Sequence, residues 1–161
     1  MKQPSAANTL RPSVLDRLIE ASRPRGHRRT TSVRELRRSV ARDLEWLLNS
    51  RVLVPDHWHE LAEARTSVLT YGVPDFATAS WTSTEDRTAL ANAIESAIQR
   101  FEPRLSRNSV RVYVLSLPEP ADFRLRYRIS AMLHVEPIRE PVVYDTDLDL
   151  ERGALQVREV G

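Results

Sequence analysis

The chain has 161 residues, of which 41% are hydrophobic and 29% charged, and this size and composition indicate one domain with a modest core. It has no cysteine, which excludes disulfides, thiolate nucleophiles and cysteine-ligated zinc, and fits a reducing, cytoplasmic location. No run approaches the roughly eighteen apolar residues of a membrane span, and residues 1–11 lack the apolar segment of a secretory signal, so we expect neither membrane insertion nor export.

Charge is distributed unevenly along the chain. Residues 1–51 hold 12 basic and 5 acidic side chains, a net +7, whereas the remaining residues hold 12 basic and 17 acidic side chains, a net −5. Lys2 is the only lysine, so nearly every cation is an arginine, whose planar fork suits carboxylate or phosphate contacts. This asymmetry fits a nucleic acid or an acidic protein partner, and it fits equally an arginine-rich codon bias.

The N-terminal segments precede a strongly predicted helix. Residues 1–12 are polar, contain two prolines and are predicted to form a disordered lead, followed by one domain over residues 13–161. Residues 12–20 predict a short amphipathic helix with Ser13 as its cap. Residues 22–31 combine proline and glycine with several cationic groups and predict a loop whose role stays open.

The clearest helix signal begins at Ser32, which forms a capping box with Glu35. Apolar residues then recur at spacings of three and four up to position 48: Val33, Leu36, Val40, Leu44 and Leu47. Arg34, Arg38 and Arg42 follow one another at i, i+4 and i+8 on another face of the same helix. A bridging region over 51–76 is predicted to be helical from about position 57 and to end in a Tyr-Gly-x-Pro-Asp turn.

A second long helix is predicted from Ser83 to Phe101. Ser83 caps it three residues before Asp86, and Leu90, Ile94 and Ile98 give it an apolar stripe. Pro103 ends it, because a proline inside would remove a donor and disfavours helical backbone at the residue before it.

After this helix the apolar period changes to two. Strands are predicted at 109–117 and 123–133, with shorter strands at 141–146 and 154–160. The order of elements, helices first and then a meander, predicts an α+β fold in which N-terminal helices pack on one face of a small antiparallel sheet.

Candidate chemical sites give weak signals. His57 and His59 lack a third metal ligand, and the acidic run 145–153 lacks the glycine and glutamate of a calcium loop, so we interpret that run as a charged loop. No catalytic carboxylate pair, phosphate loop or dinucleotide fingerprint is present, and we expect no catalytic residue, no metal and no cofactor. Alternating arginines at 124, 126 and 128 are interpreted as a solvated strand face; a nucleic-acid surface would need stacking aromatics, and we expect no nucleic-acid partner.

Four stretches together resemble a known family: RDLEWLLNSR (42–51), SVLTYGVPDF (67–76), AIESAIQRFEPRL (93–105) and VRVYVLSL (110–117). In order and spacing they are similar to TssE, the family of type VI secretion baseplate subunits related to a phage baseplate wedge protein once labelled lysozyme-like. The similarity covers residues 13–160. It implies a structural protein at the cytoplasmic face of the envelope, with partners TssF, TssG, TssK and the contractile sheath subunits TssB and TssC, and a fold that offers the sheath a strand-pairing template.

The resemblance also assigns a contact to Glu102, Pro103 and Arg104, which match the Glu-Pro-Arg motif at the family's contact with neighbouring wedge subunits. We expect Pro103 to fix the backbone so that both charges are presented to a partner, with an intramolecular pair as the alternative. On that expectation, Arg104→Ala leaves thermal unfolding nearly unchanged and abolishes co-purification with TssF and TssG.

An exposed sheet edge is the second expected contact, because its unpaired amides and carbonyls can accept a sheath strand. Residues 154–160 are the first candidate edge and 141–146 the second; deletion of 154–161 is expected to block sheath extension without preventing baseplate assembly. Two other functions remain open: a peptidoglycan hydrolase, and a nucleic-acid adaptor that uses the basic N-terminal third.

Overall fold

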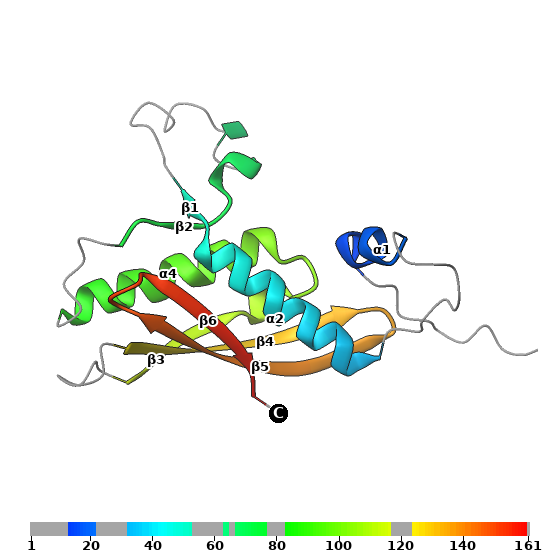
Figure 1. Cartoon of the computed structure of the whole chain (residues 1–161). Helices are drawn as coiled ribbons and strands as arrows, with labels where there is room; N and C mark the ends of the chain where they lie inside the picture. The colour runs from blue at the N-terminus through cyan, green and yellow to red at the C-terminus, as the bar shows by residue number, and fades with distance from the viewer. Residues whose placement is uncertain are drawn as a thin grey trace, which may run out of the picture.

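A computed structural model describes residues 13–21, 32–52, 63–64, 67–76, 83–116 and 124–160 (Figure 1). The predicted lead 1–12, the predicted loop 22–31 and the pair His57 and His59 lie outside these residues. The main helices are α1 (Val14–Ala21), α2 (Val33–Asn49) and α4 (Thr84–Phe101), with short 3-10 turns at Val68–Thr70 and Arg107–Ser109.

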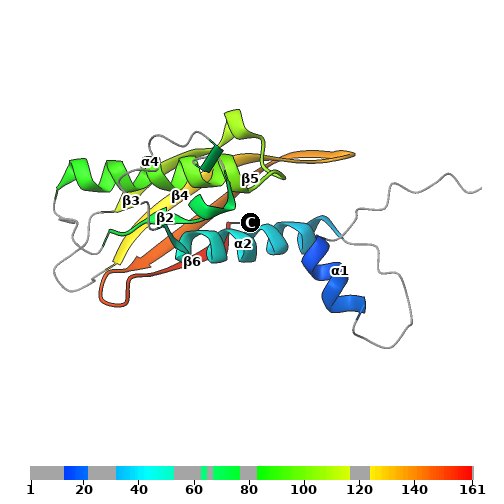
Figure 2. The same cartoon turned by 90° about the horizontal axis from the view of Figure 1, so that it is seen from above.

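The sheet has four antiparallel strands in the order β3-β4-β5-β6, and helices α2 and α4 lie side by side on one of its faces (Figures 1 and 2). The strands are β3 (Arg111–Ser116), β4 (Arg124–Val135), β5 (Ile138–Asp149) and β6 (Ala154–Glu159). A separate parallel pair joins β1 (Arg51–Val52) to β2 (Val73–Pro74). The α+β class and the one-sided placement of the helices are confirmed.

Helix α2 begins as its sequence predicts. Ser32 Oγ accepts from the Glu35 amide at 3.1 Å while Glu35 Oε2 accepts from the Ser32 amide at 2.8 Å, so both halves of the capping box are present. The predicted apolar stripe is buried at Leu36, Val40, Leu44 and Leu47, together with Leu48. The helix signal in the sequence therefore gives both its start and its inward face.

Helix α4 also matches its prediction. Ser83 Oγ accepts from the Asp86 amide at 3.3 Å, and Leu90, Ile94 and Ile98 are buried. The helix ends at Phe101, with Glu102 as C-cap, immediately before Pro103. This end places the Glu-Pro-Arg corner beside the middle of α2.

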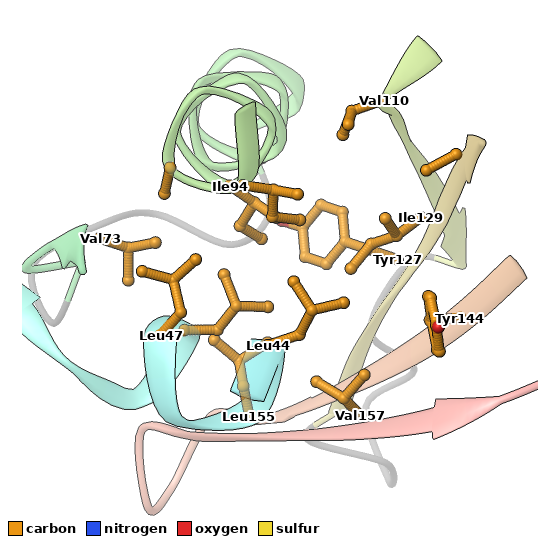
Figure 3. Packing of buried hydrophobic residues seen from close by; sticks show 14 of the residues in the cluster. Leu44, Leu47, Val73, Ile94, Val110, Tyr127, Ile129, Tyr144, Leu155 and Val157 are labelled. Carbon is orange, nitrogen blue, oxygen red and sulfur yellow. The ribbon is translucent and has the colours of Figure 1, made fainter. Parts of the chain in front are cut away.

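The core lies between the two helices and the sheet (Figure 3). Leu44 of α2 and Ile94 of α4 point toward Tyr127 of β4, and Leu47 points toward Val73. Each such side chain contributes about 1.5–3 kcal/mol when it leaves water. Burial raises the pKa of the Tyr127 hydroxyl, which donates to the Arg87 carbonyl oxygen at 3.3 Å and so remains a neutral donor.

Two strand predictions need correction. β5 extends over Ile138–Asp149, well beyond the predicted 141–146, and the first half of the acidic run at 145–153 is strand rather than loop. Asp145, Asp147 and Asp149 alternate with residues whose side chains are buried, Thr146 and Leu148, as in a strand with one solvated face. The loop interpretation overlooked this alternation and the arginines of β4 that lie opposite these aspartates.

Gly72 fixes the approach of the β2 segment to the end of α2. Its φ is +123°, and a Cβ there would lie 2.3 Å from the Ser50 carbonyl oxygen, which accepts from the Val73 amide at 3.0 Å. Only glycine fits both the backbone conformation and the space. The close approach brings Tyr71 to the side of α2 on which Glu102 lies.

Candidate partner-binding site

Arg104 is the centre of the Glu102-Pro103-Arg104 corner. Its guanidinium makes a two-pronged contact with Glu102, with Nε 2.8 Å from Oε1 and Nη2 2.5 Å from Oε2. It also donates to Asp43 Oδ2 at 2.6 Å and to Ser39 Oγ at 3.2 Å, both on α2. One arginine therefore ties the end of α4 to the middle of α2.

The expectation that both charges of the corner face outward is wrong. Glu102 is 4% exposed and the Arg104 side chain 17%, whereas Pro103 is exposed. Burial alone would lower the pKa of Arg104, but the hydrogen bonds and charges of Glu102 and Asp43 outweigh it and raise that pKa. The sequence shows the rigid turn at Pro103, but it does not show Asp43, 61 residues earlier, as the acceptor that turns Arg104 inward.

A groove of about 410 Å³ opens beside this corner. Its walls come from α2, the β2 segment and the corner; the side chains that line it include Trp46, Tyr71, Phe101 and Pro103. Trp46 is 49% exposed, and the Tyr71 and Phe101 rings meet edge to face at 5.2 Å. An exposed tryptophan beside a shallow aromatic hollow, held over a buried ion pair, is suited to receive an apolar side chain of another protein.

Helix α1 is attached to the same side of α2. Arg42 donates to Asp16 Oδ1 at 2.7 Å and to Asp43 Oδ1 at 2.9 Å, and its guanidinium also lies 5.0 Å from the Trp46 ring centre. The hydrogen bond from Arg42 is the main reason that the pKa of Asp16 falls to about 2, with further hydrogen bonds from Ser13 and Ser39. The Asp16–Arg42–Asp43 chain thus joins α1 to the corner electrostatically.

The arginines of β4 lie opposite the aspartates of β5. Arg128 donates to Asp145 at 2.7 and 2.8 Å, and Arg126 Nε lies 3.1 Å from Asp147 Oδ1. Arg124 is the cross-strand neighbour of Asp149 in the same register. This face is a ladder of opposite charges and not a basic surface, which agrees with the expectation of a solvated face and weakens the nucleic-acid alternative.

The two edges of the sheet are partly covered by the helices. β6 is an edge strand, as predicted, but Asn49 of α2 bonds both the amide and the carbonyl of Leu155, and Glu45 accepts from the Val157 amide at 3.0 Å. At the other edge, Glu95 of α4 accepts from the Val112 amide of β3 at 3.1 Å. The second candidate edge, 141–146, is wrong, because β5 is paired on both sides.

Two described carboxyl groups have a clearly shifted pKa, and in both Asp16 and Asp145 the pKa is lowered. A glycosidase acid needs a raised pKa, so neither of these two is suited to that role. Asp43 and Glu102 lie near each other but share the guanidinium of Arg104. The described residues also hold no group of three metal-ligating side chains, and none of their helices has the length and apolarity to cross a membrane.

Comparison with protein families decides the classification. The model of the family "Baseplate wedge protein gp25" matches residues 34–138. The chain belongs to this family. Comparison with curated proteins and with solved structures gives no significant match.

The gp25 family match runs from the first turn of α2 to the start of β5 and includes the corner and both helices that form the groove. It is the family of TssE, so the resemblance noted in the four sequence stretches is confirmed. Membership also makes the chain a baseplate component of a contractile injection system that contacts other baseplate components. Sequence reasoning missed Asp43, Tyr71 and Trp46 as parts of the site, although all three lie inside two of those stretches.

Proposed function

We propose that this chain is the TssE-type baseplate subunit of a type VI secretion system, acting as a structural protein on the cytoplasmic face of the cell envelope. It joins the wedge subunits TssF and TssG, with TssK further out, and templates the first ring of the TssB/TssC sheath. The family match supports the baseplate role, and the four stretches from 42 to 117 favour the type VI branch.

The observation that carries the wedge contact is the groove beside the corner. Glu102 and Arg104 set the shape of this groove by holding α4 against α2, and Pro103 and Trp46 supply its exposed rim. We therefore keep all three corner residues as partner-binding residues, with two different roles. Glu102 and Arg104 position the surface, and Pro103 contacts the partner. A rigid rim loses little conformational entropy on assembly.

A co-purification experiment tests this assignment. The tagged chain is expressed with the gene cluster of its host, and Trp46→Ala is compared with the wild type; we expect loss of TssF and TssG from the eluate and an unchanged unfolding curve. Leu69→Ala is the control, because Leu69 is a similarly exposed apolar residue, 59% against 49%, that does not line the groove. Equal recovery of the wedge subunits with both variants would contradict the assignment.

For sheath templating, the described geometry favours β3 over β6 as the pairing edge. On β6 the outward groups of Leu155 and the outward amide of Val157 already bond to α2. On β3 the outward amide of Val112 is bonded by Glu95, and among the described residues no such bond reaches Val114, the next outward residue. The deletion of 154–161 is also unsuitable as a test, because it removes Leu155, which is 1% exposed and part of the core.

A proline on β3 gives a better test of the template. Val114→Pro removes an outward N–H without removing a rung of the β3–β4 ladder, so we expect shorter or absent sheaths while the wedge still assembles. Val114→Thr keeps the amide and the shape and is expected to support normal sheaths. Normal sheath length in a folded Val114→Pro protein would exclude β3 as the pairing edge.

A further inference from the structure

A second groove, of about 630 Å³, lies between α2 and β6, two elements that run side by side (Figures 1 and 2). It is separate from the corner groove, and its lining residues include Arg34, Arg38, Ala41, Glu45 and Val157. The arginines at i and i+4 along α2 that the sequence singles out therefore stand on one rim of a defined groove.

The charges along this part of α2 are not equally satisfied. Arg37 bonds Glu140 at 2.9 Å and Glu159 at 3.3 Å, and Arg42 bonds Asp16 and Asp43. Arg34 and Arg38 are exposed and have no acidic partner among the residues that the structure describes. Two uncompensated cations therefore lie next to each other on the groove rim.

We propose that the α2–β6 groove binds an acidic, extended segment of a partner protein. Arg34 and Arg38 are separated by about 6 Å along the helix axis, and alternate side chains of an extended chain are about 6.6 Å apart, so two carboxylates of such a segment match the two guanidinium groups. Ala41 and Val157 offer an apolar surface to the side chain next to the acidic ones. The inference concerns a different face from the proposed wedge contact and does not depend on it.

The main-chain bonds of β6 define how this segment binds. Asn49 and Glu45 occupy the outward groups of Leu155 and the Val157 amide, so the segment cannot extend the sheet there and is held by its side chains. The groove also contains the carboxylates Glu45 and Glu159 and no aromatic ring among its lining residues. The lack of an aromatic ring disfavours nucleic acid, because such binding relies on stacking surfaces, whereas the two carboxylates restrict an acidic side chain to the Arg34–Arg38 rim.

Titration of the isotope-labelled full chain with synthetic peptides tests the proposal. The probe is a short peptide of alternating glutamate and valine, and the reference peptide carries glutamine in place of glutamate. We expect saturable amide shifts at Arg34, Arg38 and Val157 with the acidic peptide only. Because each exposed ion pair contributes little, Arg34→Gln with Arg38→Gln should weaken binding by roughly 3- to 30-fold.

A matched control separates a groove from a general charge effect. Arg107→Gln with Arg152→Gln removes the same charge from exposed positions outside the groove and should leave the affinity unchanged. The proposal is overturned if the control double variant weakens binding as much as the groove variant. It is also overturned if the acidic peptide shifts no groove amide, or if a single-stranded oligonucleotide binds the groove more tightly than the peptide.

Discussion

Arginine–carboxylate pairs occur both at the corner and on the open face of the sheet, but the two sets differ in burial. At the corner the Glu102 side chain is 5% exposed and that of Arg104 17%, whereas on the sheet the Arg126 side chain is 48% exposed. Buried ion pairs cost much when one partner is lost, because the other charge stays out of water; exposed pairs are screened and contribute little. The same chemistry therefore holds two helices together in one place and only keeps a strand face soluble in the other.

The largest effect is expected from Arg104→Met, which keeps the aliphatic bulk of the side chain but leaves Glu102 without its guanidinium. Removing one partner of a buried pair destabilises by about 3–5 kcal/mol. Urea unfolding monitored by tryptophan fluorescence measures the loss. This revises the expectation that substitution of Arg104 leaves stability unchanged, since that expectation assumed two outward-facing charges.

A second substitution tests whether the unpaired charge of Glu102 causes the loss of stability in Arg104→Met. Arg104→Met combined with Glu102→Gln removes the buried carboxylate as well, and Asp43 keeps its bond to Arg42, so part of the lost stability should return. If Arg104→Met costs less than about 1 kcal/mol, the corner pair contributes no more than an exposed pair. Burial would then not explain the difference between the corner and the sheet face.

A smaller effect is expected at Asp16, where a partly exposed carboxylate binds Arg42. Its folded pKa of about 2 lies below the ordinary value of about 3.9, so the contribution to stability is complete above pH 4 and is lost as the pH falls toward 2. In Arg42→Gln the pKa of Asp16 should rise toward its ordinary range. Carboxyl chemical shifts over an acid titration measure both values; an unchanged pKa in the variant would show that Arg42 does not hold α1.

The smallest effect is expected at the sheet ladder. Arg126→Gln removes an exposed pair with Asp147 and should cost about 0.2–1 kcal/mol, with a loss that shrinks further at high salt. The same unfolding assay as for Arg104→Met provides the comparison. A loss of stability as large as that of Arg104→Met would mean that burial does not decide how much an arginine–carboxylate pair contributes.

Local patterns in the sequence were sufficient for the helices and for most of the strands. The Ser32–Glu35 capping box, the spacing of three and four in α2 and α4, and the alternation in β4 each depend on neighbours within a few residues. These patterns also predicted that the helices cover one sheet face. The extent of β5 was missed because its aspartates are stabilised by arginines on another strand.

The candidate site could be located from the sequence but not oriented. The Glu-Pro-Arg motif marked the turn correctly, yet the direction of its charges depends on Asp43 and Ser39, which are far away in the chain. Likewise, nothing near residues 154–160 shows that Asn49 and Glu45 cover that edge. Contacts of this kind arise only when two elements pack, so no local pattern contains them.

The central claim is that the groove beside the corner faces a wedge partner, and in-cell photocrosslinking at Trp46 tests it most directly. A photoreactive phenylalanine replaces Trp46 in cells that express the whole secretion cluster, and Leu69, which is 59% exposed and does not line the groove, is the control position. We predict crosslinks to TssF or TssG from position 46 and none from position 69. Crosslinks from position 46 to sheath subunits only, or to no baseplate protein, would contradict the account.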